Sequence, residues 1–141
     1  MSKEVFDFLA ANRPFYLATV DDGVPKVRPM GFVMLHEDRL WLGMGSQKNV
    51  FRQIKANPKI EIAATNPEGQ ATSPEGQWIR ISGTLTFDER PELFALAVEV
   101  MPMLKDIYPG DGPKMAIGWV AGEASFFNAA SGGVVKTVKL G

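Results

Sequence analysis

Two positively charged residues, Arg28 and Lys48, stand where a cation suits a bound anion. Arg28 precedes Pro29, whose missing N–H predicts a sheet edge or a bulge where a ligand can reach the backbone. Lys48 follows the loop 43–47 and opens a predicted helix, where a cation opposes the helix dipole unless an anion lies between them. Together the two charges match one phosphomonoester dianion, and each charged hydrogen bond contributes about 1.5–3 kcal/mol.

Each charge also has a plain structural explanation. Arg28 can extend from a strand end towards a surface carboxylate, and Lys48 can be a solvated lysine beside a capped helix. The segment Gly43-Met44-Gly45 is not a dinucleotide fingerprint, because a third glycine and the βαβ context are missing. The pair therefore predicts an anion site only if the fold brings both residues together.

The composition excludes several other kinds of chemistry. The 141 residues contain no cysteine and one histidine, which excludes disulfides, thiolate catalysis, cysteine-based zinc sites and multi-histidine metal sites. Lysine plus arginine number 15 against 16 acidic residues, which argues against a nucleic-acid-binding protein that works through a general basic field. His36 lies in a predicted turn, and no paired carboxylates stand out. We expect no metal, and the catalytic residues stay undefined.

The length indicates one domain over residues 1–141, with a tail from about residue 131 that either pairs weakly or frays. The N-terminal segment carries Glu4 and Asp7 within its apolar pattern, which argues against a signal peptide. No apolar run approaches the roughly 18 residues needed to cross a bilayer. We therefore expect a cytoplasmic protein that binds neither membrane nor nucleic acid.

Turn signals and hydrophobic periodicity outline the elements that must position the two cations. A hairpin signal at Asp22-Gly23, frequent turns and the absence of a βαβ series predict a mainly β fold, a six- to seven-stranded antiparallel split β-barrel with short helices at its joints. The alternative is an α+β sandwich with one exposed sheet face. Strands are expected at 15–20, 25–35, 39–43, 59–64, 77–87, 115–120 and 123–128, with helices at the N-terminus, 48–56 and 91–101 and a loop at 105–114.

The strand expected at 25–35 is apolar on both faces, with Arg28 on one of them. A small barrel has a single interior, so the outer face of this strand needs another cover: a partner subunit, a flat ligand or both. Strand 77–87 alternates regularly and places Trp78 and Arg80 on the face opposite its isoleucines.

A loop rich in proline, glycine and serine spans residues 65–76 and repeats Pro-Glu-Gly-Gln at 67–70 and 74–77. This loop is either a local insertion that lengthens a hairpin or a lid over a neighbouring site. The sequence does not decide between the two.

The order of five short segments resembles the pyridoxamine 5′-phosphate oxidase-like, FMN-binding split-barrel superfamily, and within it small nitroimidazole-reductase-like flavin proteins. The resemblance covers roughly residues 3–128 and is carried by the order and spacing of the segments. They are Tyr-Leu-Ala-Thr-Val (16–20), Val-Arg-Pro-Met-Gly-Phe (27–32), Leu-Trp-Leu-Gly-Met-Gly-Ser-Gln-Lys-Asn-Val (40–50), Ile-Lys-Ala-Asn-Pro-Lys-Ile-Glu-Ile (54–62) and Trp-Ile-Arg-Ile-Ser-Gly-Thr-Leu (78–85).

The resemblance implies a homodimer that holds one FMN in each of two clefts at the interface. Arg28, Ser46 and Lys48 match the residues that hold the phosphate in the family. The backbone after Arg28 would lie along the isoalloxazine ring, and Trp78 would approach the cofactor, with the second subunit as one source. The cofactor-binding residues implied in this way are Arg28, Pro29, Met30, Gly31, Phe32, Ser46, Lys48, Asn49, Trp78 and Arg80.

The leading expectation is an FMN-dependent oxidoreductase that passes hydride or electrons between a reduced nicotinamide, or another donor, and a small-molecule acceptor. A non-catalytic flavin carrier or sensor, and a split barrel that binds a deazaflavin or haem, are the alternatives. Two departures argue against oxidation of pyridoxamine phosphate. Trp78 replaces a glutamine of the vitamin B6 oxidases, and their C-terminal Arg-Leu-x-Pro-type ending is absent.

Overall fold

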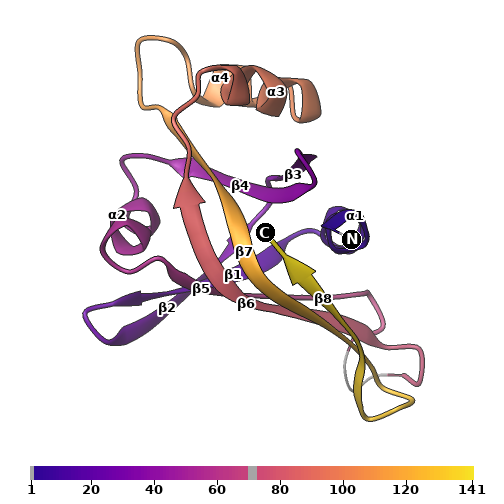
Figure 1. The fold of residues 1–141 in the computed structure, drawn as a ribbon. Helices are drawn as coiled ribbons and strands as arrows, with labels where there is room; N and C mark the ends of the chain where they lie inside the picture. Colours follow the sequence, from indigo (N-terminus) through magenta and orange to yellow (C-terminus); the bar gives the residue numbers. More distant parts are fainter. Residues whose placement is uncertain (1, 70–72) are drawn as a thin grey trace.

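Eight antiparallel strands form one curled sheet in the computed structural model, which describes residues 2–69 and 73–141 (Figure 1). This confirms the mainly β split barrel, with one strand more than the sequence predicted. The strands are β1 (Phe15–Asp21), β2 (Val24–Met30), β3 (Val33–His36), β4 (Arg39–Gly45), β5 (Lys59–Thr65), β6 (Gln77–Phe87), β7 (Met115–Asn128) and β8 (Gly133–Leu140), and the helices are α1 (Ser2–Ala11), α2 (Asn49–Ala56), α3 (Glu92–Val100) and α4 (Leu104–Ile107).

The strand order shows where the barrel is split. The order is β2-β1-β5-β6-β7-β4-β3, with β8 paired to β7. β2 and β3 therefore stand at opposite ends of the order, although only residues 31–32 separate them along the chain. The sheet must curl until its two ends lie near each other, and these two strands do not form a ladder together within the described residues.

The single strand expected at 25–35 is wrong, because the chain is broken at residues 31–32 into β2 and β3. Within β3, Val33 is buried in the barrel core, while Met34 and the preceding Phe32 are buried against α3, so this strand is covered on both faces. The chain crosses here from one end of the sheet to the other. The apolar character on both faces is therefore explained by burial in β3, but not in β2, whose outer face is exposed.

The outer face of β2 is left uncovered within the chain. Val27 is 68% exposed, and Tyr16, on the same face of the paired strand β1, is also exposed. The sequence predicted that another surface must cover this face. Nothing in the described chain does so.

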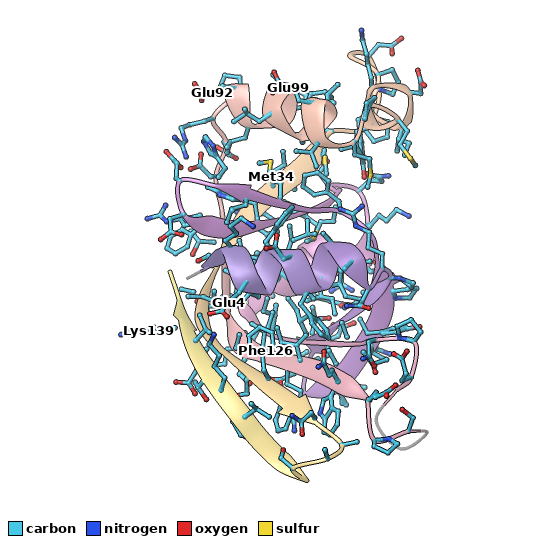
Figure 2. All side chains as sticks on the ribbon, turned by 90° about the vertical axis from the view of Figure 1, so that its right-hand side faces the viewer. Glu4, Met34, Glu92, Glu99, Phe126 and Lys139 are labelled. Atoms are coloured by element: carbon cyan, nitrogen blue, oxygen red, sulfur yellow. The ribbon has the colours of Figure 1, made fainter. Side chains whose placement is uncertain are left out.

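Two apolar clusters fill the fold. The larger one lies inside the barrel, where Leu17, Ile62 and Ile81 meet from three adjacent strands. The smaller one packs Trp41 and Leu93 between the sheet and α3. Figure 2 shows α1 lying across the strands, with Met34 above it and Phe126 below it, so this helix covers the barrel on that side.

β7 is one continuous strand, where the sequence predicted two strands at 115–120 and 123–128. Gly122 pairs with Gly83 of β6, and a Cβ on Gly122 would lie 2.1 Å from the Ser82 carbonyl oxygen. The backbone at Gly122 has a φ of +155°, which glycine adopts readily. Two facing glycines let the two backbones approach closely, so the ladder continues through the position where the sequence predicted a break.

The C-terminal segment forms β8 and pairs with β7 from Gly133 to Leu140, with Val138 buried against the core.

The loop before β6 is held at both ends by Asn66, whose side-chain oxygen accepts from the Gln77 N–H at 3.0 Å. Residues 70–72, which include the last residue of the first Pro-Glu-Gly-Gln, lie outside the described residues. In the described ranges, no helix is both long and apolar enough to cross a membrane.

We expect Gly122→Ala to lower the free energy of unfolding by more than about 2 kcal/mol, because the new Cβ meets the β6 backbone at a strained φ. Gly110→Ala is the matched control, since no atom lies within 4 Å of a Cβ there. The control should change stability by less than about 0.5 kcal/mol in urea unfolding. Equal effects of the two substitutions would contradict the proposed close approach.

Candidate functional site

A cavity of about 490 Å³ opens between β2, the end of β4 and the N-terminus of α2. It lies where β2 ends, beside the split of the barrel, and Arg28 and Lys48 both line it. The fold therefore brings together the two cations that the sequence singled out. The full lining is Arg28, Pro29, Met30, Gly31, Gly43, Met44, Gly45, Lys48, Asn49, Val50 and Tyr108.

The register of β2 turns Arg28 towards the barrel interior. Arg28 pairs with Leu17 of β1, and Leu17 pairs with Ile62 of β5, so the three side chains share one face of the sheet. Leu17 and Ile62 are fully buried in the apolar core. A guanidinium on this face must find hydrogen-bond acceptors there, because unpaired buried donors are costly.

Three neutral groups accept hydrogen bonds from Arg28. Its Nη1 donates to the Leu17 carbonyl oxygen at 3.2 Å and to Thr19 Oγ1 at 2.8 Å. Its Nη2 donates to Gln53 Oε1 at 2.8 Å, and the Thr19 hydroxyl donates to the same oxygen at 2.6 Å. Thr19 and Gln53 are 2% and 4% exposed. The Arg28–Thr19–Gln53 cluster thus ties β2, β1 and α2 together at the inner edge of the cavity.

The charge of Arg28 is hydrogen-bonded but not neutralised. No carboxylate pairs with it in the part of the chain that the structure describes. Burial lowers the pKa of the Arg28 guanidinium from its ordinary value, because desolvation disfavours the charged form. Arginine nevertheless stays protonated in proteins. An anion in the cavity would supply the missing opposite charge.

Lys48 adds a second cation at the start of α2. It occupies the N-cap position with an extended backbone, and no side chain caps the helix. The first N–H groups of a helix have no intrahelical acceptor, and the helix dipole makes this end positive. Lys48 is exposed and has no ion-pair partner among residues 2–69 and 73–141. No acidic side chain lines the cavity in those ranges, so its electrostatics favour an anion.

Two of the predicted site residues lie beside the cavity without lining it. Phe32 is buried in the smaller cluster, where its ring contacts the position that a Cβ on Gly43 would take. Ser46 is exposed, and its backbone N–H donates to the Lys114 carbonyl oxygen at 2.8 Å.

Trp78 and Arg80 lie on the outer face of β6, opposite the face that fills the barrel. Trp78 stacks on Phe127, with ring centroids 5.2 Å apart and an interplanar angle of 3°. Arg80 Nε lies 3.6 Å from Glu61 Oε2 on the neighbouring strand. A single chain therefore does not bring these two residues to the cavity, which Arg28 lines from the inner face of the sheet.

Tyr108 lines the cavity and was missed by the sequence analysis. It lies just after α4, in a segment that the sequence predicted as loop, and burial raises the pKa of its hydroxyl. The only sequence signal is an aromatic residue within a run rich in proline and glycine. A side chain placed by such a connection cannot be located from periodicity.

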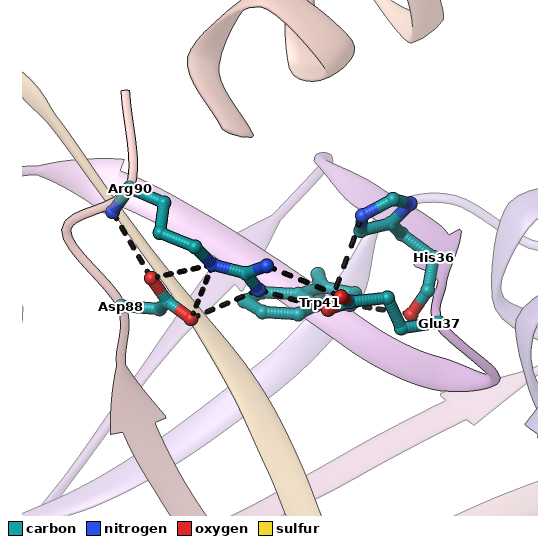
Figure 3. Close-up of polar contacts among 5 residues, drawn as sticks. All are labelled: His36, Glu37, Trp41, Asp88 and Arg90. Carbon is teal, nitrogen blue, oxygen red and sulfur yellow. Dashed lines mark hydrogen bonds and ion pairs between the residues drawn. The ribbon is translucent and has the colours of Figure 1, made fainter. Parts of the chain in front are cut away.

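A separate polar network joins the β3–β4 turn to the segment before α3 (Figure 3). Arg90 Nη2 lies 2.8 Å from Glu37 Oε1 and 3.0 Å from Asp88 Oδ2. Hydrogen bonds from Arg90 lower the pKa of both carboxyls. His36 Nε2 lies 3.9 Å from Glu37 Oε1, and His36 does not line the cavity. The network holds α3 in place and leaves the single histidine away from the two cations.

Comparison with known proteins gives one family and a set of similar folds. Residues 1–120 match the family model described as pyridoxamine 5′-phosphate oxidase. The solved structure of a NimC/NimA family protein from Clostridium acetobutylicum is 34% identical, with a TM-score of 0.85 over 98% of this chain and 92% of that chain. No curated protein matches the chain.

Two more distant structures show the same fold alone. A haem-binding protein from Mycobacterium smegmatis is 16% identical, with a TM-score of 0.73 over 98% of this chain and 57% of that one. The haem storage protein of Vibrio cholerae is 17% identical, with a TM-score of 0.68 over 89% of this chain and 92% of that one.

We expect Gln53→Leu to lower the free energy of unfolding by about 1–3 kcal/mol, because Arg28 and Thr19 each lose a buried acceptor. Gln53→Glu keeps an oxygen in the same place and should stay within about 1 kcal/mol of the unchanged protein. Urea unfolding of both variants tests the Arg28–Thr19–Gln53 cluster. A leucine variant as stable as the glutamate variant would show that the cluster does not hold the strands and α2 together.

Proposed function

Because the chain belongs to the pyridoxamine 5′-phosphate oxidase family, we propose that it binds FMN and acts as an oxidoreductase on a small molecule. The observation that carries this proposal is the cavity in which Arg28, Lys48 and the N-terminus of α2 meet without a carboxylate. A phosphomonoester carries close to two negative charges at neutral pH. It would therefore supply the opposite charge that this part of the chain lacks.

The residues that line the cavity form two groups, one suited to the phosphate of FMN and one suited to its ring system. Arg28 and Lys48 would hold the phosphate, with the first N–H groups of α2 as further donors. Residues 29–31 and Met44 offer a less polar wall for the ring system. When bound, FMN supplies hydride or electron transfer, and the protein positions it and excludes competing reactions.

We further propose that the protein is a homodimer with the cofactor site at the interface. The support is the uncovered outer face of β1 and β2, which presents Tyr16 and Val27 to solvent. The same outer surface continues across β5 to β6, where Trp78 and Arg80 lie. A second copy packed on this surface could bring its Trp78 and Arg80 towards the first copy's cavity.

Haem is the second candidate cofactor, because two proteins with this fold are described as haem-binding or haem-storing. In this chain His36 ends β3, contacts Glu37 and Trp41, and does not line the cavity of the two cations. Met30 and Met44 both line that cavity, and each carries a thioether. Because the single histidine lies outside this lining, the cavity favours the flavin phosphate.

The absorbance spectrum of the purified protein tests the cofactor directly. A yellow protein that releases FMN on denaturation, identified by mass spectrometry, supports the proposal. A Soret band that disappears in His36→Ala, Met30→Ala or Met44→Ala supports haem instead. A colourless protein that does not bind added FMN overturns the flavin proposal. Reduction of bound flavin by NAD(P)H, followed by reoxidation by a small acceptor, distinguishes an enzyme from a flavin carrier.

We expect Lys48→Ala to weaken FMN binding at least about tenfold, because a charged hydrogen bond contributes about 1.5–3 kcal/mol. Binding of riboflavin, which has no phosphate, should stay the same. Lys55→Ala removes an equal charge from the last turn of the same helix and serves as the control. Gln53→Glu should also weaken FMN binding selectively, because its carboxylate neutralises Arg28. If Lys48→Ala weakens both ligands equally, Lys48 does not bind the phosphate.

We expect Val27→Glu to convert the homodimer into monomers of 15.4 kDa, because a charge on the outer face of β2 would be buried at the interface. Light scattering after size-exclusion chromatography measures the mass. Val135→Glu is the control, since Val135 is 55% exposed on β8. A monomeric unchanged protein would contradict the dimer, and a dimeric Val27→Glu variant would place the interface elsewhere.

A further inference from the structure

A second cavity, of about 370 Å³, lies between α3, the loop after α4 and the start of β7. Figure 1 shows this region at the top of the molecule, where α3 and α4 pack above the end of the sheet. Leu93 and Ile117 form a buried apolar floor, and Phe94 and Met115 are half-buried beside them. The volume falls in the range of small-molecule pockets, about 300–1,000 Å³.

The second cavity adjoins the first one through shared walls. Tyr108 lines both cavities. Met115 lines the second cavity, and its methyl group lies 2.1 Å from the position of a Cβ on Gly43, which lines the first. The two spaces are therefore back to back, with Tyr108 and Met115 between them. A molecule in one cavity would restrict these side chains and so change the affinity of the other cavity for its own ligand.

Two acidic residues, Asp88 and Glu89, and two basic ones, Arg90 and Lys114, line the second cavity, so the charges of its lining balance. Arg90 is paired with Asp88 and Glu37, as Figure 3 shows, so its charge is already satisfied. Lys114 and Glu89 are both exposed and have no ion-pair partner in the described ranges of the chain. These two charges are opposite in sign. In contrast to the first cavity, the second one has no excess of positive charge and favours a neutral occupant.

Tyr108 is a hydrogen-bond donor in the lining of this apolar space. Its hydroxyl has no hydrogen-bond partner among the described residues, and its ring meets Phe94 edge-on, with centroids 6.5 Å apart. Burial raises the pKa of the Tyr108 hydroxyl, so it stays protonated and donates at neutral pH. An aromatic ring packs favourably against two such rings, and an acceptor on it could reach the hydroxyl.

We propose that the second cavity is a binding site for a small, neutral, planar aromatic molecule whose acceptor atom receives a hydrogen bond from Tyr108. Leu93 and Ile117 contact its apolar body, and Phe94 packs against its ring. This site goes beyond the proposed flavin function, since it takes a different class of ligand in a different cavity. Tyr108 and Met115 couple its occupancy to the cofactor cavity.

Acetophenone, a flat ring with one carbonyl acceptor, is a suitable probe, and ethylbenzene is the matched molecule without the acceptor. We expect acetophenone to shift the NMR signals of Leu93, Phe94 and Ile117 in a saturable way. Tyr108→Phe should weaken acetophenone binding about fivefold, the effect of one lost hydrogen bond, and leave ethylbenzene binding unchanged. Thr137→Val removes the hydroxyl of an exposed residue on β8 that lines neither cavity, and it should change neither.

Ethylbenzene binding also reports that the Tyr108→Phe variant keeps an intact cavity. The inference is overturned if acetophenone leaves the signals of the cavity residues unshifted, or if Tyr108→Phe binds it as tightly as the unchanged protein does.

A second measurement compares acetophenone binding to the protein with and without FMN, and this arm alone rests on the proposed function. Coupling through Tyr108 requires that each molecule change the dissociation constant of the other by the same factor. If the protein binds acetophenone in this cavity but does not bind FMN, the second site is supported and the proposed cofactor is contradicted. If it binds FMN while acetophenone has no effect on the cavity residues, the second site is contradicted.

Discussion

The site depends on one interaction, the hydrogen bonding of the Arg28 guanidinium to neutral groups inside the barrel. Arg28 is half-buried, and an arginine withdrawn from solvent usually gains a carboxylate, which would satisfy its donors and cancel its charge. Here Thr19 and Gln53 satisfy the donors and leave the charge in place. The same bonds fix α2 against β1 and β2. Arg28 therefore also positions the helix whose N-terminus contributes to the anion site. The fold thereby keeps a positive charge at a cavity without self-neutralisation.

The split of the barrel makes room for this arrangement. If β2 and β3 formed a ladder, backbone groups near the end of β2 would be consumed by the sheet and side chains would fill the interior. Because the chain crosses at residues 31–32 instead, the end of β2 stays open to the cavity beside Gly43 and Gly45 of β4. Phe32 and Met34 anchor the crossing in the smaller apolar cluster. The crossing at residues 31–32 therefore opens the cavity, and Phe32 and Met34 beside it hold the crossing in place.

Local signals in the sequence predicted most of this fold. The period-2 pattern of β6 and the turn at Asp22-Gly23 depend on neighbouring residues alone, and the observed β6 spans the predicted range 77–87. The charge and position of Arg28 and Lys48 predicted an anion site, provided that the fold brings the two residues together. The break at 31–32 could not be predicted, because a run that is apolar on both faces does not show where the chain leaves one strand and enters the next. Gln53 was also missed, because a glutamine on a short helix gives no sign that it points inwards.

The positions of Trp78 and Arg80 limit which cavity they can reach. Successive residues of a strand face opposite sides of the sheet, and the residues between and after them, Ile79 and Ile81, are fully buried in the barrel. Trp78 and Arg80 therefore cannot turn towards their own chain's cavity without removing those isoleucines from the core. If they contact a cofactor, that cofactor must belong to a second copy. If the protein acts alone, their roles end at the stack on Phe127 and the pair with Glu61, and the cavity works with its two cations only.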